Sequence, residues 1–201
     1  MAAGVEVVGL THGFEDRVLF ADLSWSVPGG SITAVMGPSG VGKSTLLALI
    51  AGHLTPWQGQ IRTAGAVEWI VQSVPMLERR SALDNAAMGL IAQRVKWEEA
   101  RQRAQTALEN FALGASAATR VAELSGGERQ RVAVVRSVLR GAPVLLADEP
   151  TASLDPATCE SICDALVASA RAGASVLVAT HDPAVAARCE KVLDLSVCAR
   201  A

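Results

Sequence analysis

The sequence predicts an α/β fold in which a largely parallel sheet is joined by an antiparallel β piece near the N-terminus and by a helical insertion. First, short continuous apolar runs alternate with helix-forming segments, which is typical of strands buried on both faces of a parallel sheet. Second, residues 5–27 contain short β-rich stretches separated by turn residues. Third, the pattern over about 83–125 is helical, and this range is the expected insertion.

The length and composition fit one domain over residues 1–201, and they exclude several classes of protein. Hydrophobic residues make up 50% of the 201 residues, and a mean hydropathy of +0.31 excludes a disordered chain. The net charge of −2 argues against a nucleic-acid partner. No membrane span is expected, because the longest uncharged stretch, Leu23–Gly42, is broken by prolines and glycines. The first residues lack the pattern of a signal peptide, so we expect a cytoplasmic protein.

The part before the insertion is expected to form strands and one helix. Pro28-Gly29-Gly30 marks a turn before a buried strand, and this strand runs into a glycine-rich loop and an apolar helix, Leu46–Ala51. A later strand of this part ends at Gln72. The expected strands here are Val5–Leu10, Val18–Phe20, Ser24–Val27, Ile32–Met36 and Val67–Val71.

The insertion and the part that follows it carry clear helix signals. Trp97–Leu108 is rich in strong helix formers. Ser125 and Glu128 have the spacing of a capping box, which begins a helix through Leu139. Asp155 and Asp182 each precede a proline, as an N-cap does before proline at the first helical position. The expected strands here are Val144–Ala147, Val176–Ala179 and Val192–Leu195.

The four cysteines, Cys159, Cys163, Cys189 and Cys198, contain no CxxC pair. Cys159 and Cys163 are four residues apart on an expected helix, which makes a metal site conceivable, but no third ligand lies nearby in the sequence. We therefore expect buried or half-buried thiols, the commoner state of cysteine in cytosolic proteins.

A glycine-rich loop between an expected strand and an expected helix fits the pattern G-x-x-x-x-G-K-[ST]. Its glycines let backbone N–H groups surround phosphates, and the helix N-terminus adds donors and a positive dipole end. Lys43 would bring a positive charge to the β- and γ-phosphates, and the Ser44 hydroxyl is placed to bind Mg²⁺. The sequence therefore predicts a P-loop NTPase whose nucleotide-binding residues here are Gly37, Pro38, Ser39, Gly40, Val41, Gly42, Lys43, Ser44 and Thr45.

Two carboxylates, Asp148 and Glu149, follow the apolar run Val144–Ala147. In a P-loop fold an aspartate at this strand end helps to hold Mg²⁺, and a second carboxylate can activate or orient the attacking water. A solvated pair at a strand end is the alternative. His181 also follows a core strand, which places it at the carboxyl edge of the sheet where ligands bind.

The segment Leu124–Gln130, with the letters LSGGERQ, resembles the signature sequence of ATP-binding-cassette (ABC) ATPases. Other positions fall into the same order: Gln72 resembles the Q-loop glutamine, Ser153–Asp155 resembles the D-loop, and His181 resembles the switch histidine. Phe14 resembles the aromatic residue that stacks on adenine. The resemblance covers nearly the whole chain.

The resemblance implies a subunit that binds ATP and hydrolyses it with Mg²⁺. Gln72, Glu149 and His181 would be the catalytic residues around the attacking water and the γ-phosphate. Ser44, Gln72 and Asp148 would hold the metal.

The resemblance also implies partners. In this family the signature of one subunit faces the γ-phosphate bound by the other, in a head-to-tail homodimer or heterodimer, so Ser125, Gly126 and Gly127 would contact the partner's nucleotide. Asp155, of the D-loop segment, would also bind nucleotide. A groove after Gln72 receives a helix of an integral membrane permease, and Met76, Leu77 and Leu83 could be its apolar anchors. The chain would then lie on the inner face of the cell membrane.

Several alternatives stay open from the sequence. A soluble ABC ATPase outside transport, such as a cluster-assembly component, carries the same motifs. Ser125 and Glu128 also cap a helix, a role compatible with phosphate binding. The base could rest against Phe20 or Trp25 instead of Phe14.

Overall fold

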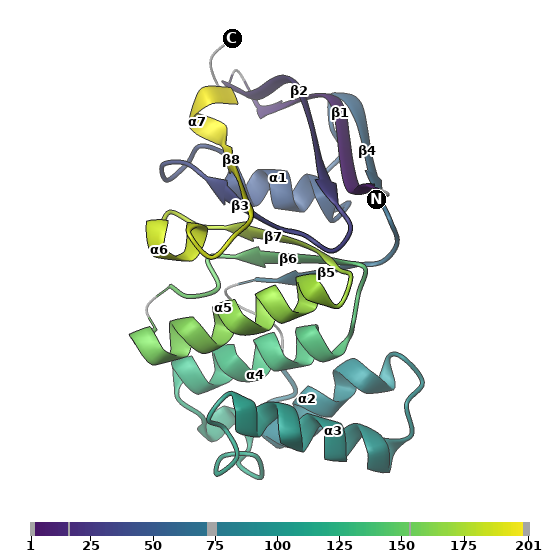
Figure 1. Ribbon diagram of the computed structural model, residues 1–201, viewed down its shortest axis with the longest axis vertical. Coiled ribbons are helices and arrows are strands. Elements are labelled where there is room, and N and C mark those ends of the chain that lie inside the picture. The colour runs from purple at the N-terminus through teal and green to yellow at the C-terminus, as the bar shows by residue number, and fades with distance from the viewer. Residues whose placement is uncertain (1–2, 16, 72–75, 153, 199–201) are drawn as a thin grey trace. The chain divides into compact units, whose positions relative to one another are not determined.

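The structure, a computed structural model, describes residues 3–15, 17–71, 76–152 and 154–198 (Figure 1). The chain divides into two compact units. The first, called the sheet unit below, comprises Met1–Trp69, Ala142–Glu149 and Val167–Ala201. The second, called the helical unit, comprises Ile70–Gly141 and Pro150–Leu166.

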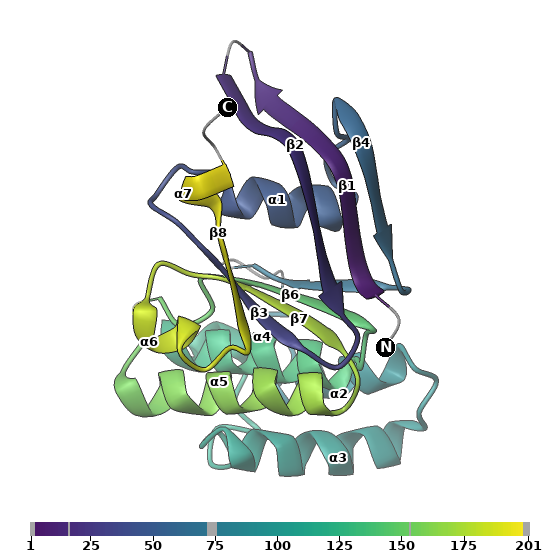
Figure 2. The ribbon, with the colours of Figure 1, turned by 45° about the horizontal axis from the view of Figure 1, so that its top comes forward.

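An antiparallel sheet of three strands forms one layer of the sheet unit, in the order β2-β1-β4 (Figure 2). The strands are β1 (Ala3–Phe14), β2 (Arg17–Pro28) and β4 (Gln58–Thr63). The sequence predicts two short strands where the structure has the continuous strand β2. The strand does not break near Asp22, because the pairing with β1 continues past it with a shift in register. The backbone N–H of Asp22 donates to the Thr11 hydroxyl at 3.2 Å, which satisfies it outside the strand ladder. The edge strand β4 was not predicted, because its residues are polar and mostly exposed.

The second sheet has five strands in the order β5-β6-β7-β3-β8. Its strands are β3 (Ile32–Met36), β5 (Val67–Ile70), β6 (Val144–Asp148), β7 (Ser175–Ala179) and β8 (Lys191–Asp194). The pairs β6–β7, β7–β3 and β3–β8 are parallel, which confirms the expected α/β class. The last strand begins and ends one residue earlier than expected, since Leu195 opens the short helix α7 (Leu195–Cys198).

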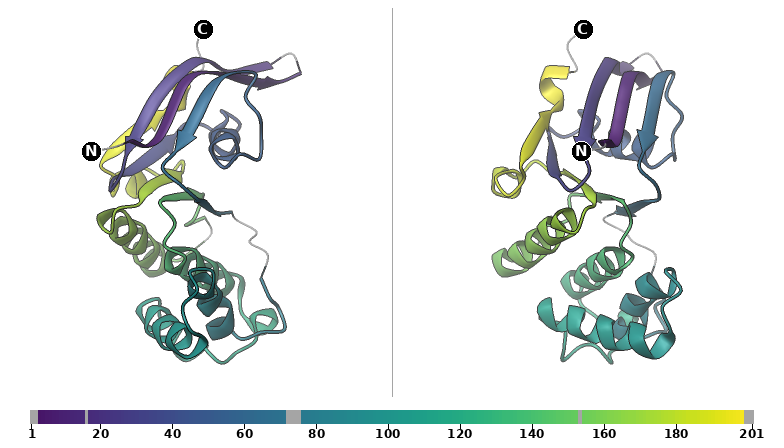
Figure 3. Two further views of the ribbon diagram at one scale, coloured as in Figure 1. Left: turned by 90° about the vertical axis from the view of Figure 1, so that its right-hand side faces the viewer. Right: turned by 45° about the vertical axis from the view of Figure 1, so that its right-hand side comes forward.

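The core of the sheet unit lies around helix α1 (Lys43–Ile50), which the ribbon views place between the two sheets (Figures 1 and 3). Leu46 and Leu47 of this helix are fully buried. They belong to one apolar cluster with Leu10 of the antiparallel sheet and Val35 of the parallel sheet. Burial of these side chains fixes the position of α1 and therefore of the loop that precedes it.

The helical unit contains the helices α2 (Ala82–Ile91), α3 (Trp97–Asn110) and α4 (Gly126–Leu139), a 3₁₀ turn at Val121–Glu123, and the start of α5 (Pro156–Arg171). Helices α2 and α4 approach closely at Gly89, where a Cβ atom would lie 2.2 Å from the carbonyl oxygen of Arg136. A further short helix, α6 (Pro183–Ala186), belongs to the sheet unit. Among the residues that the structure describes, no helix is long and apolar enough to cross a membrane.

Candidate nucleotide site

The loop before α1 has the backbone of a phosphate cradle. Gly42 has a φ of 110°, and a Cβ atom there would lie 2.9 Å from the Phe20 ring. Gly37 has a φ of 145°, and a Cβ atom there would lie 2.7 Å from a methyl carbon of Val41. Among the described residues, no side chain caps the N-terminus of α1, and its first turn contains no acidic residue. The donors of this helix start therefore remain available to an anion.

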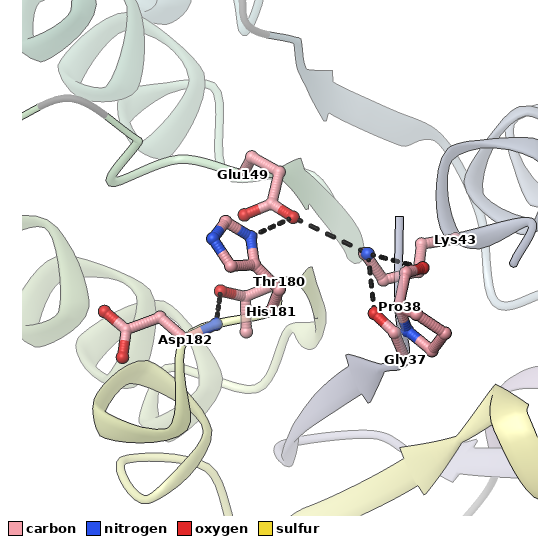
Figure 4. A network of polar contacts seen from close by, with 7 residues as sticks. All are labelled: Gly37, Pro38, Lys43, Glu149, Thr180, His181 and Asp182. Carbon is pink, nitrogen blue, oxygen red and sulfur yellow. Dashed lines mark hydrogen bonds and ion pairs between the residues drawn. The ribbon is translucent and has the colours of Figure 1, made fainter. Parts of the chain in front are cut away.

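Lys43 occupies the first position of α1, and its side chain is 9% exposed. Its ammonium donates to the carbonyl oxygens of Gly37 at 2.9 Å and Pro38 at 3.4 Å (Figure 4). It also lies 3.7 Å from a carboxylate oxygen of Glu149. These contacts hold the lysine charge over the glycine-rich loop, where a bound phosphate would meet it.

Glu149 and His181 meet because they follow adjacent parallel strands, β6 and β7. The backbone N–H of Glu149 donates to the Ala179 carbonyl at 2.9 Å, and the φ of Glu149 is 45°, in the left-handed region. His181 Nδ1 lies 3.0 Å from the Glu149 oxygen that also faces Lys43 (Figure 4). The buried Thr180 supports the segment that carries His181, since its hydroxyl accepts from the Asp182 N–H at 3.0 Å. A left-handed glutamate is strained, and such strain is common at reactive sites.

Asp148 lies at the end of β6 with the Ser44 hydroxyl as its hydrogen-bond partner. Burial raises the pKa of Asp148 above its ordinary value of 3.8, and the neighbouring Glu149 adds to this rise. The hydrogen bond from Ser44 and the charge of Lys43 act in the opposite direction. A half-buried carboxylate beside a hydroxyl provides the hard oxygen donors that Mg²⁺ prefers. The residues present therefore fit this metal.

Phe14, at the end of β1, is 52% exposed. Its ring contacts His12 edge to face, with centroids 5.5 Å apart, and His12 in turn contacts Trp57 at 5.6 Å. Of the two alternatives for the base, Phe20 is fully buried and Trp25 packs on the core.

The signature residues lie in the helical unit, at the start of α4. The Ser125 hydroxyl accepts from the Glu128 N–H at 3.3 Å, and the Glu128 carboxylate accepts from the Ser125 N–H at 3.0 Å. The predicted capping box is therefore present. Glu128 also accepts from the Ser116 hydroxyl at 2.7 Å. Gly126 has open space around the position of a Cβ atom, so the backbone there is accessible to a ligand.

Asp155 caps α5 as expected, accepting from the Thr158 N–H at 3.0 Å and from the Thr158 hydroxyl at 2.6 Å. Arg131 of α4 donates to that hydroxyl at 3.4 Å. These bonds connect the helix that begins at the signature with the residue that resembles the D-loop aspartate. They also hold the pKa of Asp155 below its ordinary value of 3.8, with the Thr158 hydroxyl as the main cause.

A loop of the helical unit presents an apolar side chain of the kind expected for a partner. Leu77 is 49% exposed. Asn85 is fully buried, accepts from the Leu77 N–H at 2.9 Å and donates to the carbonyls of Leu77 and Ser81. The buried amide thereby fixes the loop that carries Leu77.

The sheet unit brings Lys43, Ser44, Asp148, Glu149 and His181 together, whereas Ser125 and Asp155 belong to the helical unit. Gln72 and Ser153 lie outside the described residues. Cys159 and Cys163 belong to no group of three metal-ligating side chains in the described ranges.

Sequence reasoning missed Arg17, which donates to the Gly40 carbonyl of the phosphate loop at 3.2 Å. It also missed Ser116, Thr158 and Arg131 beside the signature and the D-loop segment. None of these four residues lies in a recognisable motif. Only Arg17 had a possible signal, because it pairs with Phe14 across the hairpin.

The loop, the lysine and the paired carboxylates define a phosphate-loop ATPase. The family model described as ABC transporter matches residues 20–152. The chain therefore belongs to the ABC transporter family and is an ATP-binding domain of it.

Named relatives agree with this assignment. The chain is 35% identical over 202 residues to the lipoprotein-releasing system ATP-binding protein LolD of Pseudomonas syringae pv. tomato. The aligned region covers 92% of this chain and 89% of LolD. It is 33% identical to the macrolide export ATP-binding/permease protein MacB of Chromobacterium violaceum, with 96% of this chain covered but only 33% of MacB. The chain thus spans about a third of MacB and most of LolD.

A solved structure gives the same result for the fold. The dimeric structure of the ATP-binding cassette MJ0796 in a post-hydrolysis state, bound to ADP and Pi, has a TM-score of 0.83 and 29% identity. The match covers 94% of this chain and 93% of that one.

Proposed function

We propose that this chain powers transport through a separate membrane permease, and that ATP drives two ATPase domains together head to tail. The observation that carries the proposal is the pairing of a nearly complete nucleotide site in the sheet unit with a second helix start, at Ser125, in the helical unit. A second phosphate site is redundant for the nucleotide that one chain binds by itself, whereas each nucleotide in a head-to-tail pair of chains is bound by both sites. The dimeric structure of the solved relative supports a dimer of ATPase domains.

ATP binding rests on the sheet unit. The start of α1 supplies backbone donors, and Lys43 supplies the cation for the β- and γ-phosphates. Phe14 offers its exposed ring to the base. Ser44 and Asp148, together with Gln72, are the proposed ligands of Mg²⁺. When bound, this ion neutralises charge on the phosphate oxygens.

Hydrolysis is assigned to the polar cluster at the ends of β6 and β7. Glu149 takes the proton of the attacking water or orients that water, and its position beside Lys43 keeps the carboxylate close to the phosphate site. His181 contacts Glu149 and is 72% exposed, and we propose that it leaves this contact to turn toward the γ-phosphate. Gln72 is the third proposed catalytic residue.

Transport is favoured over the soluble alternative by the names of the relatives. LolD is named as part of a lipoprotein-releasing system, MacB as an exporter, and the relative PhnC 2 of Pseudomonas syringae pv. syringae as an import protein for phosphonates. We propose that the permease contacts the loop around Leu77, which Asn85 holds in place. The chain then works in the cytoplasm, on the inner face of the cell membrane.

The test uses Glu149→Gln, which keeps the shape of the side chain and removes its basicity. We expect the variant to bind ATP, to hydrolyse it at least about 100-fold more slowly, and to elute as an ATP-dependent dimer from a sizing column. Wild type with ADP is the control and should elute as a monomer. Retained turnover would assign the base to another group, and a monomer in ATP would contradict the head-to-tail model.

A further inference from the structure

The hydroxyl of Ser125, the serine of the signature, has one hydrogen, and the structure shows it donated to Glu128. Ser125 Oγ donates to the Glu128 carboxylate at 2.7 Å and accepts from the Glu128 N–H at 3.3 Å. A serine hydroxyl has a single donor, and phosphate oxygens of ATP at neutral pH are acceptors. Ser125 therefore cannot donate to a phosphate while it donates to Glu128.

Glu128 has hydrogen-bond donors besides the Ser125 hydroxyl. Its carboxylate also accepts from the Ser125 N–H at 3.0 Å and from the Ser116 hydroxyl at 2.7 Å. The Ser116 hydroxyl, then the Ser125 hydroxyl and then the Ser125 N–H hold the pKa of Glu128 below its ordinary value of 4.5, so the group is ionised at neutral pH. A rotation of the Ser125 hydroxyl alone would release it and would leave the carboxylate held by two donors.

The charge of Glu128 lies at the point where the proposed dimer brings in a phosphate. Burial slightly opposes its ionisation, and Arg131 is the cation that lowers its pKa through space. No acidic residue occupies the first turn of α1, whereas Glu128 occupies the first turn of α4. The start of α4 thus carries an acidic residue in its own first turn, and the start of α1 does not.

We propose that Glu128 is a positioning residue that competes with the γ-phosphate of the opposing chain for the Ser125 hydroxyl and thereby sets the ATP concentration at which the dimer closes. This inference rests on the proposed head-to-tail function and deepens it. The competition has two parts: an occupied hydroxyl donor and repulsion between like charges. Both act only in the closed dimer, so ATP binding by the monomer is unaffected.

The decisive variant is Glu128→Gln in a Glu149→Gln background, which blocks hydrolysis. The amide oxygen of glutamine still accepts from the Ser125 N–H, so the cap is kept while the charge is removed. We expect about threefold tighter association at each of two sites, and therefore a dimer constant about tenfold lower in ATP. Sedimentation equilibrium at several ATP concentrations measures this constant.

The matched control is Glu99→Gln. Glu99 occupies the same third position in α3 and pairs with Arg103 on the surface at 3.6 Å. Glu99→Gln removes the same charge from the same position of a helix that has no side-chain cap in the described part of the chain, and we expect the parent's dimer constant. Raising the salt from about 50 to about 500 mM should shrink the advantage of Glu128→Gln, since added ions screen repulsion; a purely structural cap would give no such change.

A second variant keeps the inference falsifiable if Glu128→Gln unfolds. Ser116→Ala keeps the charge but removes one of the other two donors, so the carboxylate holds the Ser125 hydroxyl more firmly and the dimer should be weaker. A dimer of Glu128→Gln no tighter than the parent's, or a Ser116→Ala dimer as tight as the parent's, overturns the inference. Absence of an ATP-dependent dimer in the parent itself would instead overturn the proposed function and this inference with it.

Discussion

Two helix starts, those of α1 and α4, show how the same backbone geometry serves two different purposes. The start of α1 has Gly42 at its cap position, with no capping side chain among the described residues and with Lys43 at its first position. The start of α4 is capped by Ser125 and carries Glu128 in its first turn. One start offers unsatisfied donors and a positive charge, while the other is satisfied by its own side chains and is negative. Only the first is prepared to hold a phosphate by itself.

The difference predicts an order of binding at the two proposed phosphate sites. We expect the start of α1, with its available donors, to bind nucleotide in the single chain, and the self-capped start of α4 to bind only when a ligand displaces its internal partner. The sheet unit also carries the exposed Phe14, so the proposed base contact and the proposed phosphate contacts belong to the same unit. The variants below test this asymmetry, from the largest expected effect to the smallest.

Lys43→Ala should have the largest effect. The β- and γ-phosphates lose their charge-assisted donor, and we expect ATP affinity to fall about 100-fold or more. Titration with a fluorescent ATP analogue measures it. Lys96→Ala, which changes a lysine before α3, is the control and should bind as wild type does. Unchanged ATP affinity in Lys43→Ala would show that the glycine-rich loop is not the phosphate-binding site.

Phe14→Ala should have an intermediate effect. Loss of one stacking contact should weaken ATP about tenfold and GTP to a similar degree, because stacking accepts any purine. We also expect wild type to hydrolyse GTP within about tenfold of ATP. Competition titrations with both nucleotides check this. Equal binding by the variant and wild type would show that the base rests elsewhere.

Ser116→Ala should have the smallest of these effects, a decrease in the free energy of unfolding that depends on pH. The folded state lowers the pKa of Glu128 below 4.5, mainly through Ser116, so this stabilisation is complete above pH 4.5 and is lost as the pH falls through the lowered value. Wild type should therefore be more stable than Ser116→Ala at pH 7, and the gap should narrow at pH 3. Urea unfolding at both pH values measures it, and a gap that widens in acid would contradict the assignment.

The sequence was sufficient where the determinants are local. The phosphate loop, the capping box at Ser125 and the cap at Asp155 each depend on residues within a few positions, and the structure contains all three. The meeting of Glu149 and His181 follows from the adjacency of two parallel strands. The roles of these residues in catalysis stay predictions.

Other features depend on contacts that no local pattern encodes. The bond from Ser116 to Glu128 crosses an irregular loop, and the contact of Arg17 with Gly40 joins a hairpin to the phosphate loop. Strand β4 is held by its pairing with β1 and not by an apolar face of its own. Such features are set by tertiary pairing, which sequence periodicity does not report.

The most direct test of a nucleotide site shared between two chains mixes two inactive variants, Lys43→Ala and Ser125→Arg. In a head-to-tail dimer of the two, one site combines both defects, and the other combines an intact Lys43 with an intact Ser125. With random pairing at equal concentrations half of the dimers are mixed, so the mixture should recover about a quarter of wild-type ATP hydrolysis. Lys43→Ala mixed with the double variant has no intact site and should stay inactive. A mixture of the two single variants that hydrolyses no more ATP than each alone would contradict a site shared between chains.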